Sequence, residues 1–160
     1  MIIRPFVPDD LTAITQLTID TFGPFYEEHF RPLVGELIFA NQHGNWRTDY
    51  HRQVAALHDP DQHKHIAIGD VEGTIAGYVA FSVDPENRNG NVEMLAVDEQ
   101  HRRLGVGREL CEHAFAEMRE LRADVVQIAT GGDPFHAPAR ALYEELGCTP
   151  LPVTVYYRQF

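Results

Sequence analysis

Residues 93–108 read EMLAVDEQHRRLGVGR, and this stretch carries the strongest indication of function in the chain. It begins as a strand-like pattern, passes through a polar loop and enters a helix predicted over about 105–122. Gly105 and Gly107 let the backbone approach a ligand and turn its N–H groups inward. With the positive end of the helix dipole, these N–H groups form an anion site. Further positive charge comes from Arg102, Arg103 and Arg108. The stretch therefore predicts a pyrophosphate-binding loop.

Two common phosphate-binding motifs do not match this stretch. A P-loop would require GxxxxGK[ST], but the only lysine of the chain is Lys64. A Rossmann fingerprint would require GxGxxG after an N-terminal strand, whereas this glycine pair comes late in the chain. One other interpretation stays open, in which the glycines only shape a turn and the arginines are solvated.

The length and composition are those of one folded domain spanning 1–160. Hydrophobic residues make up 44% of the 160 residues and charged residues 23%, which is enough to bury a substantial core. The formal net charge is −11, so the surface repels phosphate backbones. We therefore expect no nucleic-acid partner and favour a cationic small molecule or a basic peptide.

The sequence also bears on location. No apolar run approaches the ~20 residues of a membrane span, and the N-terminus lacks the apolar region of a secretory signal. Cys111 and Cys148 have no metal-binding spacing, and we interpret them as reduced thiols. These features predict a cytoplasmic protein with no membrane partner, and they leave a homodimer open.

Hydrophobic periodicity and turn residues predict the order of the elements. Strands are expected at 2–7, 65–70, 74–83, 91–98, 125–130 and 153–158. Helices are expected after Asp9 or Asp10 and at 25–40, 46–57, 105–122 and 138–146, with Gly23-Pro24 ending the first of them. This order indicates a mixed sheet with helices on its faces.

Two motifs resemble a known family. After the strand that ends at Asp98, the pattern Arg102-x-x-Gly105-x-Gly107 resembles the acetyl-CoA pyrophosphate loop of the GNAT superfamily of N-acyltransferases. Downstream, residues 139–148 read ARALYEELGC and are similar to the A-x-x-L-Y-x-x-x-G-F helix of that family. Two positions depart from the pattern: His136 stands where the family often has asparagine, and Cys148 replaces an aromatic residue.

The resemblance implies a fold and an acyl donor. The fold is an α/β, GNAT-like mixed and mostly antiparallel twisted sheet, with helices on both faces and a splayed central strand pair. The donor is acetyl-CoA, and no metal is expected. The residues implied in binding it are Leu95, Ala96, Val97, Arg102, Arg103, Leu104, Gly105, Val106, Gly107, Arg108, His136 and Ala139.

Acetyl transfer to an amine also requires an acid and a base. Glu93 is our candidate base, because strand alternation places it on the same face as Leu95 and Val97. His136 and Asp133 are the competing bases. Tyr143 is the candidate general acid for the departing thiolate. The alternatives are a solvated Glu93 and a Tyr143 that only packs in the core.

Two other clusters carry weaker signals. The histidines of 58–65, with Asp59 and Asp61, could bind a metal, but a proline-broken loop does not fix their geometry. The segment 41–52, with Trp46 and Tyr50, is compatible with a substrate lid or with an ordinary amphipathic helix.

The sequence as a whole predicts an acetyl-CoA-dependent N-acetyltransferase that acts on a primary amine, with a small cationic acceptor favoured by the net charge. The alternatives are a protein N-terminal or lysine acetyltransferase, and a non-catalytic acyl-CoA sensor on the same fold.

Overall fold

One mixed sheet organises the molecule. A computed structural model describes residues 1–160, and its five strands lie in the order β1-β2-β3-β4-β5. The first four pair antiparallel, and β5 pairs parallel with β4. Their bounds are Ile2–Pro5, Lys64–Val71, Thr74–Asp84, Asn89–Val97 and Val125–Ile128. The expected mixed, mostly antiparallel sheet is confirmed.

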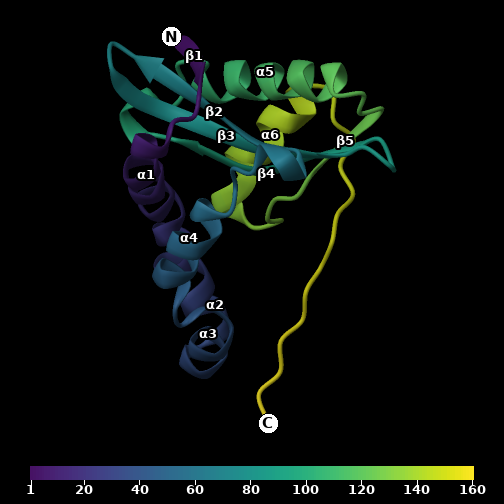
Figure 1. Cartoon of the computed structure of the whole chain (residues 1–160). Coiled ribbons are helices and arrows are strands. Elements are labelled where there is room, and N and C mark those ends of the chain that lie inside the picture. The colour runs from purple at the N-terminus through teal and green to yellow at the C-terminus, as the bar shows by residue number, and fades with distance from the viewer.

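Helices cover both faces of the sheet (Figure 1). The long helix α5, Val106–Glu120, packs on one face and buries an apolar stripe that includes Leu110, Ala114 and Met118. Helix α1, Leu11–Pro24, lies on the other face. The remaining helices are α2 (Arg31–Val34), α3 (Glu36–His43), α4 (Trp46–Ala55) and α6 (Ala137–Glu145). None of the helices is long and apolar enough to span a bilayer.

A third cluster of buried residues lies in the helical region, and Met94 of β4 packs against it. Phe30, Phe39, Trp46 and Tyr50 pack together where α2, α3 and α4 extend below the sheet. Trp46 and Tyr50 are only 3% and 8% exposed, so they are core residues of this helical region. Their burial favours the ordinary packed helix over the mobile lid for residues 41–52.

The first helix does not end at Gly23-Pro24 as predicted. The chain continues through a π-helical turn at Phe25–Phe30 into α2, and the first break comes at Gly35, whose φ is +82°. A proline removes one N–H from the helix, and the wide turn accommodates that loss without ending it. Packing of this turn against the third cluster stabilises a path that the local sequence does not favour.

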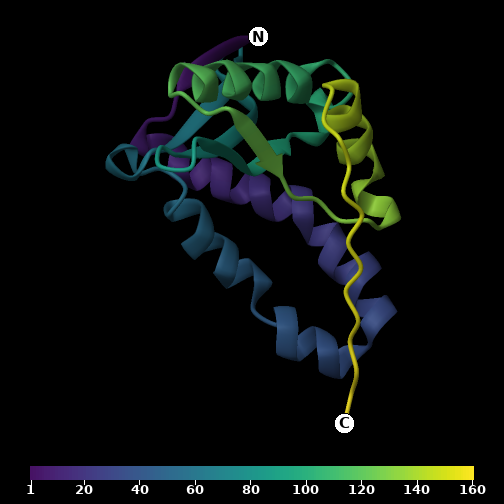
Figure 2. The ribbon, with the colours of Figure 1, turned by 90° about the vertical axis from the view of Figure 1, so that its right-hand side faces the viewer.

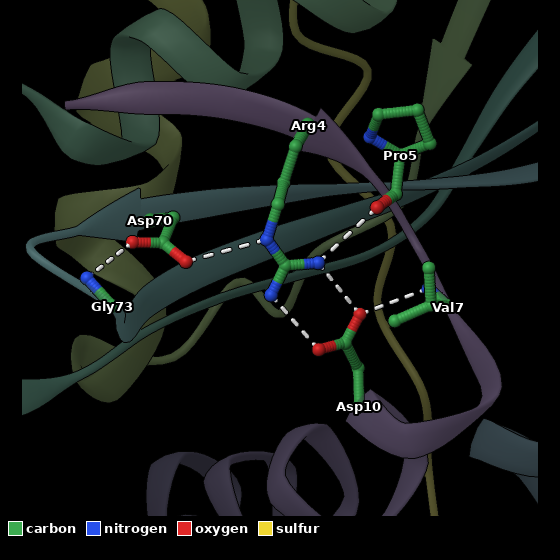
Figure 3. A network of polar contacts seen from close by, with 6 residues as sticks. All are labelled: Arg4, Pro5, Val7, Asp10, Asp70 and Gly73. Atoms are coloured by element: carbon green, nitrogen blue, oxygen red, sulfur yellow. Dashed lines mark hydrogen bonds and ion pairs between the residues drawn. The ribbon is translucent and has the colours of Figure 1, made fainter.

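The N-terminal strand is fixed by a charged contact (Figure 3). The Arg4 guanidinium donates to both carboxylate oxygens of Asp10, at 2.8 and 2.9 Å, and to Asp70 on β2 at 3.3 Å. The Asp10 carboxylate also accepts from the Val7 N–H at 2.9 Å. The contact joins β1, its neighbour β2 and the start of α1.

The strand predicted at 153–158 is absent, and this prediction was wrong. Residues 149–160 have no regular structure and leave the sheet beside the helical region (Figure 2). A strand needs a neighbour for its N–H and C=O groups, and within one chain this segment has none.

Candidate active site

The site lies where β4 and β5 separate. The parallel pairing between them ends at Val92 and Ile128. Strand β4 continues to Val97 and is paired there only with β3. The backbone of residues 93–97 therefore has one edge with no strand partner, as the predicted splayed pair requires.

A hollow of about 240 Å³ opens at this separation. The strand β4 contributes residues 92–95, and residues 128–130 form the opposite side. One wall is aromatic and consists of Phe22, Phe25, Tyr26 and Tyr50; the other consists of His136, Ala139 and Tyr143. The structure thus brings together Glu93, Leu95, His136, Ala139 and Tyr143, which were predicted from separate parts of the sequence.

Tyr143 projects from α6 into this hollow. It is half-buried, and its hydroxyl makes no hydrogen bond to another residue. Burial raises the pKa of this phenol well above its ordinary value, and the nearby thiols of Cys111 and Cys148 act in the same direction. The phenol is therefore protonated at neutral pH and has its proton available for a group bound in the hollow.

His136 is held by an aspartate. Nδ1 of His136 lies 2.6 Å from Oδ2 of Asp133, and the His136 N–H donates to Oδ1 of the same carboxylate at 3.3 Å. Burial acts to raise the pKa of Asp133, but the hydrogen bonds from His136 outweigh it, so the net pKa is lowered. Arg140 donates to the carbonyl oxygens of Gly131 and Asp133 at 2.6 and 2.7 Å and ties down the loop. These contacts therefore hold the imidazole beside the hollow.

Glu93 lies at a β-bulge that the sequence did not reveal. Ala80 pairs with Met94 and Phe81 pairs with Val92, which leaves Glu93 as an extra residue of β4. Because a bulge interrupts the alternation, the prediction that Glu93 shares a face with Leu95 and Val97 does not hold. Val92, Leu95 and Val97 face the α5 side instead.

The bulge places Glu93 between two hollows. A second hollow of about 290 Å³ shares Gln53, Glu93 and Met94 with the first. The Glu93 carboxylate accepts a hydrogen bond from the Ser82 hydroxyl at 2.6 Å. It is exposed, so it can exchange protons with water while lining the site.

The predicted anion loop forms the start of α5. Gly105 has φ of +89° and precedes the first helical residue, Val106, and no side chain caps this helix start. A Cβ on Gly107 would lie 3.4 Å from Leu142, so the glycine lets α5 approach α6 closely. Uncapped N–H groups at a helix N-terminus fit the phosphate groups of a nucleotide-type donor.

The three arginines of this loop differ in their partners. Arg102 donates from Nε to the carbonyl oxygen of Val97 at 3.2 Å, while its terminal nitrogens make no hydrogen bond. Arg103 has no ion pair, whereas Arg108 pairs with Glu145 on α6 and with Glu112 at 3.9 Å. Arg102 and Arg103 are thus the two exposed cations next to the helix start. The side chain of Leu104, which follows them, is also exposed, at 69%.

Ala96, the two cysteines and residues 58–65 were also singled out in the sequence, and the structure shows where each lies. Ala96 is fully buried against the α1 side of the sheet, so only its backbone is available at the separation. Cys111 and Cys148 are free thiols. The histidines and acids of 58–65 do not come together as a metal-ligating group.

Comparison with known proteins agrees with this geometry. Residues 14–148 match the model of the acetyltransferase (GNAT) family. The chain belongs to the GNAT acetyltransferase family. GNAT enzymes use acetyl-CoA as their acyl donor.

Individual proteins extend the comparison. A mycothiol acetyltransferase from Beutenbergia cavernae is 36% identical over 88 residues, which are 55% of this chain and only 29% of that protein. A mutant of a Bacillus halodurans protein has the same fold over the full length of both chains, with a TM-score of 0.75 at 20% identity. An aminoglycoside 6'-N-acetyltransferase from Acinetobacter haemolyticus matches 100% of this chain and 99% of its own, with a TM-score of 0.63 at 16% identity. The two structural matches share the fold of this chain.

The aromatic wall is the part of the site that sequence reasoning did not assemble. Phe22, Phe25 and Tyr26 come from α1 and the π-helical turn, and Tyr50 comes from α4. Their positions depend on how the helical region packs, which no local pattern in the sequence indicates. The aromatic content of residues 22–30 was the available signal.

Proposed function

We propose that this GNAT protein transfers an acetyl group from acetyl-CoA to the primary amine of a small cationic acceptor. The observation that carries the proposal is the meeting of Tyr143, Glu93 and the Asp133–His136 pair at one hollow. That hollow lies where β4 loses its second strand partner, so a thioester can reach both the free backbone and the acid–base groups.

The donor binds along the start of α5. The N–H groups of residues 106–108 and the side chains of Arg102 and Arg103 hold the pyrophosphate. The pantetheine arm then passes His136 and Ala139 toward the separated strands. A backbone N–H within 95–97 polarises the thioester carbonyl, and a single donor of this kind contributes about 3–4 kcal/mol to the transition state.

Protons move at two places during the transfer. An alkylammonium with a pKa near ~10 must lose a proton before its nitrogen can attack, and Glu93 accepts that proton directly or through water. When the tetrahedral intermediate collapses, the C–S bond breaks and the Tyr143 hydroxyl gives its proton to the leaving thiolate. The nitrogen, positively charged after its attack, loses its second proton, and this proton returns to the Tyr143 phenolate through water. The position of Tyr143 supports this role, because its hydroxyl makes no hydrogen bond to another residue and the side chain lines the hollow.

The Asp133–His136 pair supports a second assignment of the base. An imidazole held by a carboxylate resembles the base of other acyl-transfer sites, and it stands on the opposite wall from the aromatic residues. Substitution of Glu93 and of His136 distinguishes the two assignments.

The aromatic wall and the charge favour a cationic acceptor. The faces of Phe22, Phe25, Tyr26 and Tyr50 attract a positive charge through their quadrupoles. The net charge of −11 raises the local concentration of cations around the chain. A hollow of about 240 Å³ suits a small amine.

A panel of acceptors tests this function. Purified protein is incubated with acetyl-CoA and single primary amines, including polyamines, aminoglycosides, amino-acid amides and short peptides with free N-termini, and the released thiol is measured. We expect turnover with small cationic amines and its loss in Tyr143→Phe. Turnover only with peptides would replace the small acceptor with a protein acceptor. Binding of CoA without turnover on any amine would indicate a sensor.

A further inference from the structure

The segment 149–160 has the composition of a β-strand and the surroundings of an unpaired one. Its backbone makes no hydrogen bond to any other backbone group. The residues 153–157 read VTVYY, all β-branched or aromatic, which favours a strand. Yet Leu151, Val153 and Val155 are 86%, 74% and 66% exposed. A lone strand with exposed apolar side chains is unstable in water, so this segment requires a partner.

The edge of β5 lacks a strand as well. β5 is the last strand of the sheet and pairs only with β4, so one row of its N–H and C=O groups is unsatisfied. Val125 and Val126 on this strand are 59% and 37% exposed. A bare edge with apolar side chains is a template for an added strand.

The segment 149–160 does not cover this edge within its own chain. Both views show it leaving the sheet and running past the helical region (Figures 1 and 2). One contact there is made by Tyr157, whose ring lies edge-on to that of Phe30 with centroids 5.6 Å apart. Each chain thus presents one unpaired strand and one unpaired edge that do not meet.

We infer that two copies of this chain exchange their C-terminal segments, so that residues 151–157 of each copy add a strand to the β5 edge of the other. The exchange is reciprocal, which closes the assembly as a two-fold dimer and pairs the β5 edge of each copy. It supplies backbone partners to both unpaired elements and covers the apolar side chains of both.

Charge is compatible with this exchange. Each copy carries a net charge of −11, so contact between two arbitrary surfaces would be repulsive. The segment 149–160 contains no aspartate or glutamate and carries Arg158. It is therefore a part of the chain that can approach a second acidic copy without repulsion.

The exchange also affects one side of the hollow. Ile128, Ala129 and Thr130 line it at the end of β5. A strand added to β5 fixes that side of the hollow, so the exchange supports the separation between β4 and β5.

The mass in solution and a crosslink test the inference. Light scattering after size-exclusion chromatography should give twice the 18.1 kDa of one chain. Val153→Asp with Val155→Asp should give one chain's mass, because charges on the added strand prevent its burial. Thr149→Asp, which lies just before the strand, should leave the dimer intact. A circular dichroism spectrum like that of the parent would show that the double variant is folded.

The crosslink separates exchange from folding back. A chain with Val126→Cys, Val155→Cys and Cys148→Ser is treated with a short bis-maleimide and denatured. Exchange gives a covalent species of twice the chain's mass. Three results would overturn the inference: a crosslink confined to one chain, a monomeric parent protein, or a dimer that survives Val153→Asp with Val155→Asp.

Discussion

The contact between Asp133 and His136 closes over a residue that has no side chain. Their Oδ2 and Nδ1 atoms are 2.6 Å apart, and a Cβ on Gly131 would lie 2.3 Å from that oxygen and 2.4 Å from that nitrogen. Such distances are far inside van der Waals contact, so any side chain at position 131 would force the pair apart. The next residue, Gly132, has open space at the same place.

These two glycines provide a matched pair of variants. Gly131→Ala should displace His136 and lower kcat/KM for acetyl-CoA by roughly 100-fold, since misplacement by about 1 Å can cost that much. Gly132→Ala should leave the rate nearly unchanged. Steady-state kinetics with one good acceptor makes the comparison. Equal rates for the two variants would show that the position of His136 does not matter.

Substitution of Tyr143 separates chemistry from packing. Tyr143→Phe keeps the ring in place and removes the phenolic proton, so turnover should fall by roughly 10²- to 10⁴-fold. The melting temperature and the affinity for CoA should change little. Tyr156→Phe is the control, because that side chain does not line the hollow. A large loss of stability with normal turnover per folded molecule would make Tyr143 a core residue only.

The two candidate bases predict different pH–rate profiles. If Glu93 takes the ammonium proton, Glu93→Gln should lower the plateau rate while CoA affinity is retained, because glutamine cannot accept a proton near neutral pH. His136→Asn should then keep its activity. The opposite pattern, an active Glu93→Gln with an unaltered profile and an inactive His136→Asn, would assign the base to His136. Rates measured from pH 6 to 9 for both variants decide between them.

The helix start at Gly105 is tested against a glycine with similar backbone geometry. Gly105 and Gly73 have φ of +89° and +82°, so a side chain at either position costs about 1–2 kcal/mol of stability. Gly105→Glu should also weaken CoA binding by roughly 10- to 100-fold, since hydrogen bonds to a charged group are each worth about 1.5–3 kcal/mol. Gly73→Glu, in the β2–β3 turn, should bind CoA normally. Calorimetry that finds parent-like affinity in a folded Gly105→Glu would remove the loop from the donor site.

The Arg4–Asp10 contact predicts how stability depends on pH. The hydrogen bond from Arg4 lowers the pKa of Asp10, and the Val7 N–H adds to this against the opposing effect of burial. A folded-state pKa below the unfolded value means that the contact stabilises the protein above about pH 4 and that this contribution is lost as pH falls further. Asp10→Asn should cost about 1.5–3 kcal/mol at pH 7 and little at pH 2.5.

The neighbouring residue supplies the control for that measurement. Asp9 is exposed and makes no ion pair, so Asp9→Asn should melt like the parent at both pH values. Thermal unfolding followed by circular dichroism gives both differences. A pH-independent loss in Asp10→Asn would mean that its charge is not the stabilising feature.

The sequence by itself determined the features that depend on neighbouring residues. The glycines of residues 102–108 require a close turn before a helix, and α5 begins at Val106 as that pattern predicted. Likewise, Glu72-Gly73 at the centre of a hairpin and Gly147 after α6 adopt the positive φ values that glycine and turn residues favour. The local pattern and the family resemblance together predicted the sheet and the donor loop.

The tertiary structure alone decided the features that depend on distant residues. The bulge at Glu93 depends on the register of β3 against β4, and the aromatic wall depends on how α1 and α4 pack. Proline at 24 is a strong local signal for a helix end, but packing of the π-helical turn outweighed it. The segment 153–158 has every local feature of a strand and forms none within its own chain, because hydrogen bonds across a sheet need a second strand that local sequence cannot supply.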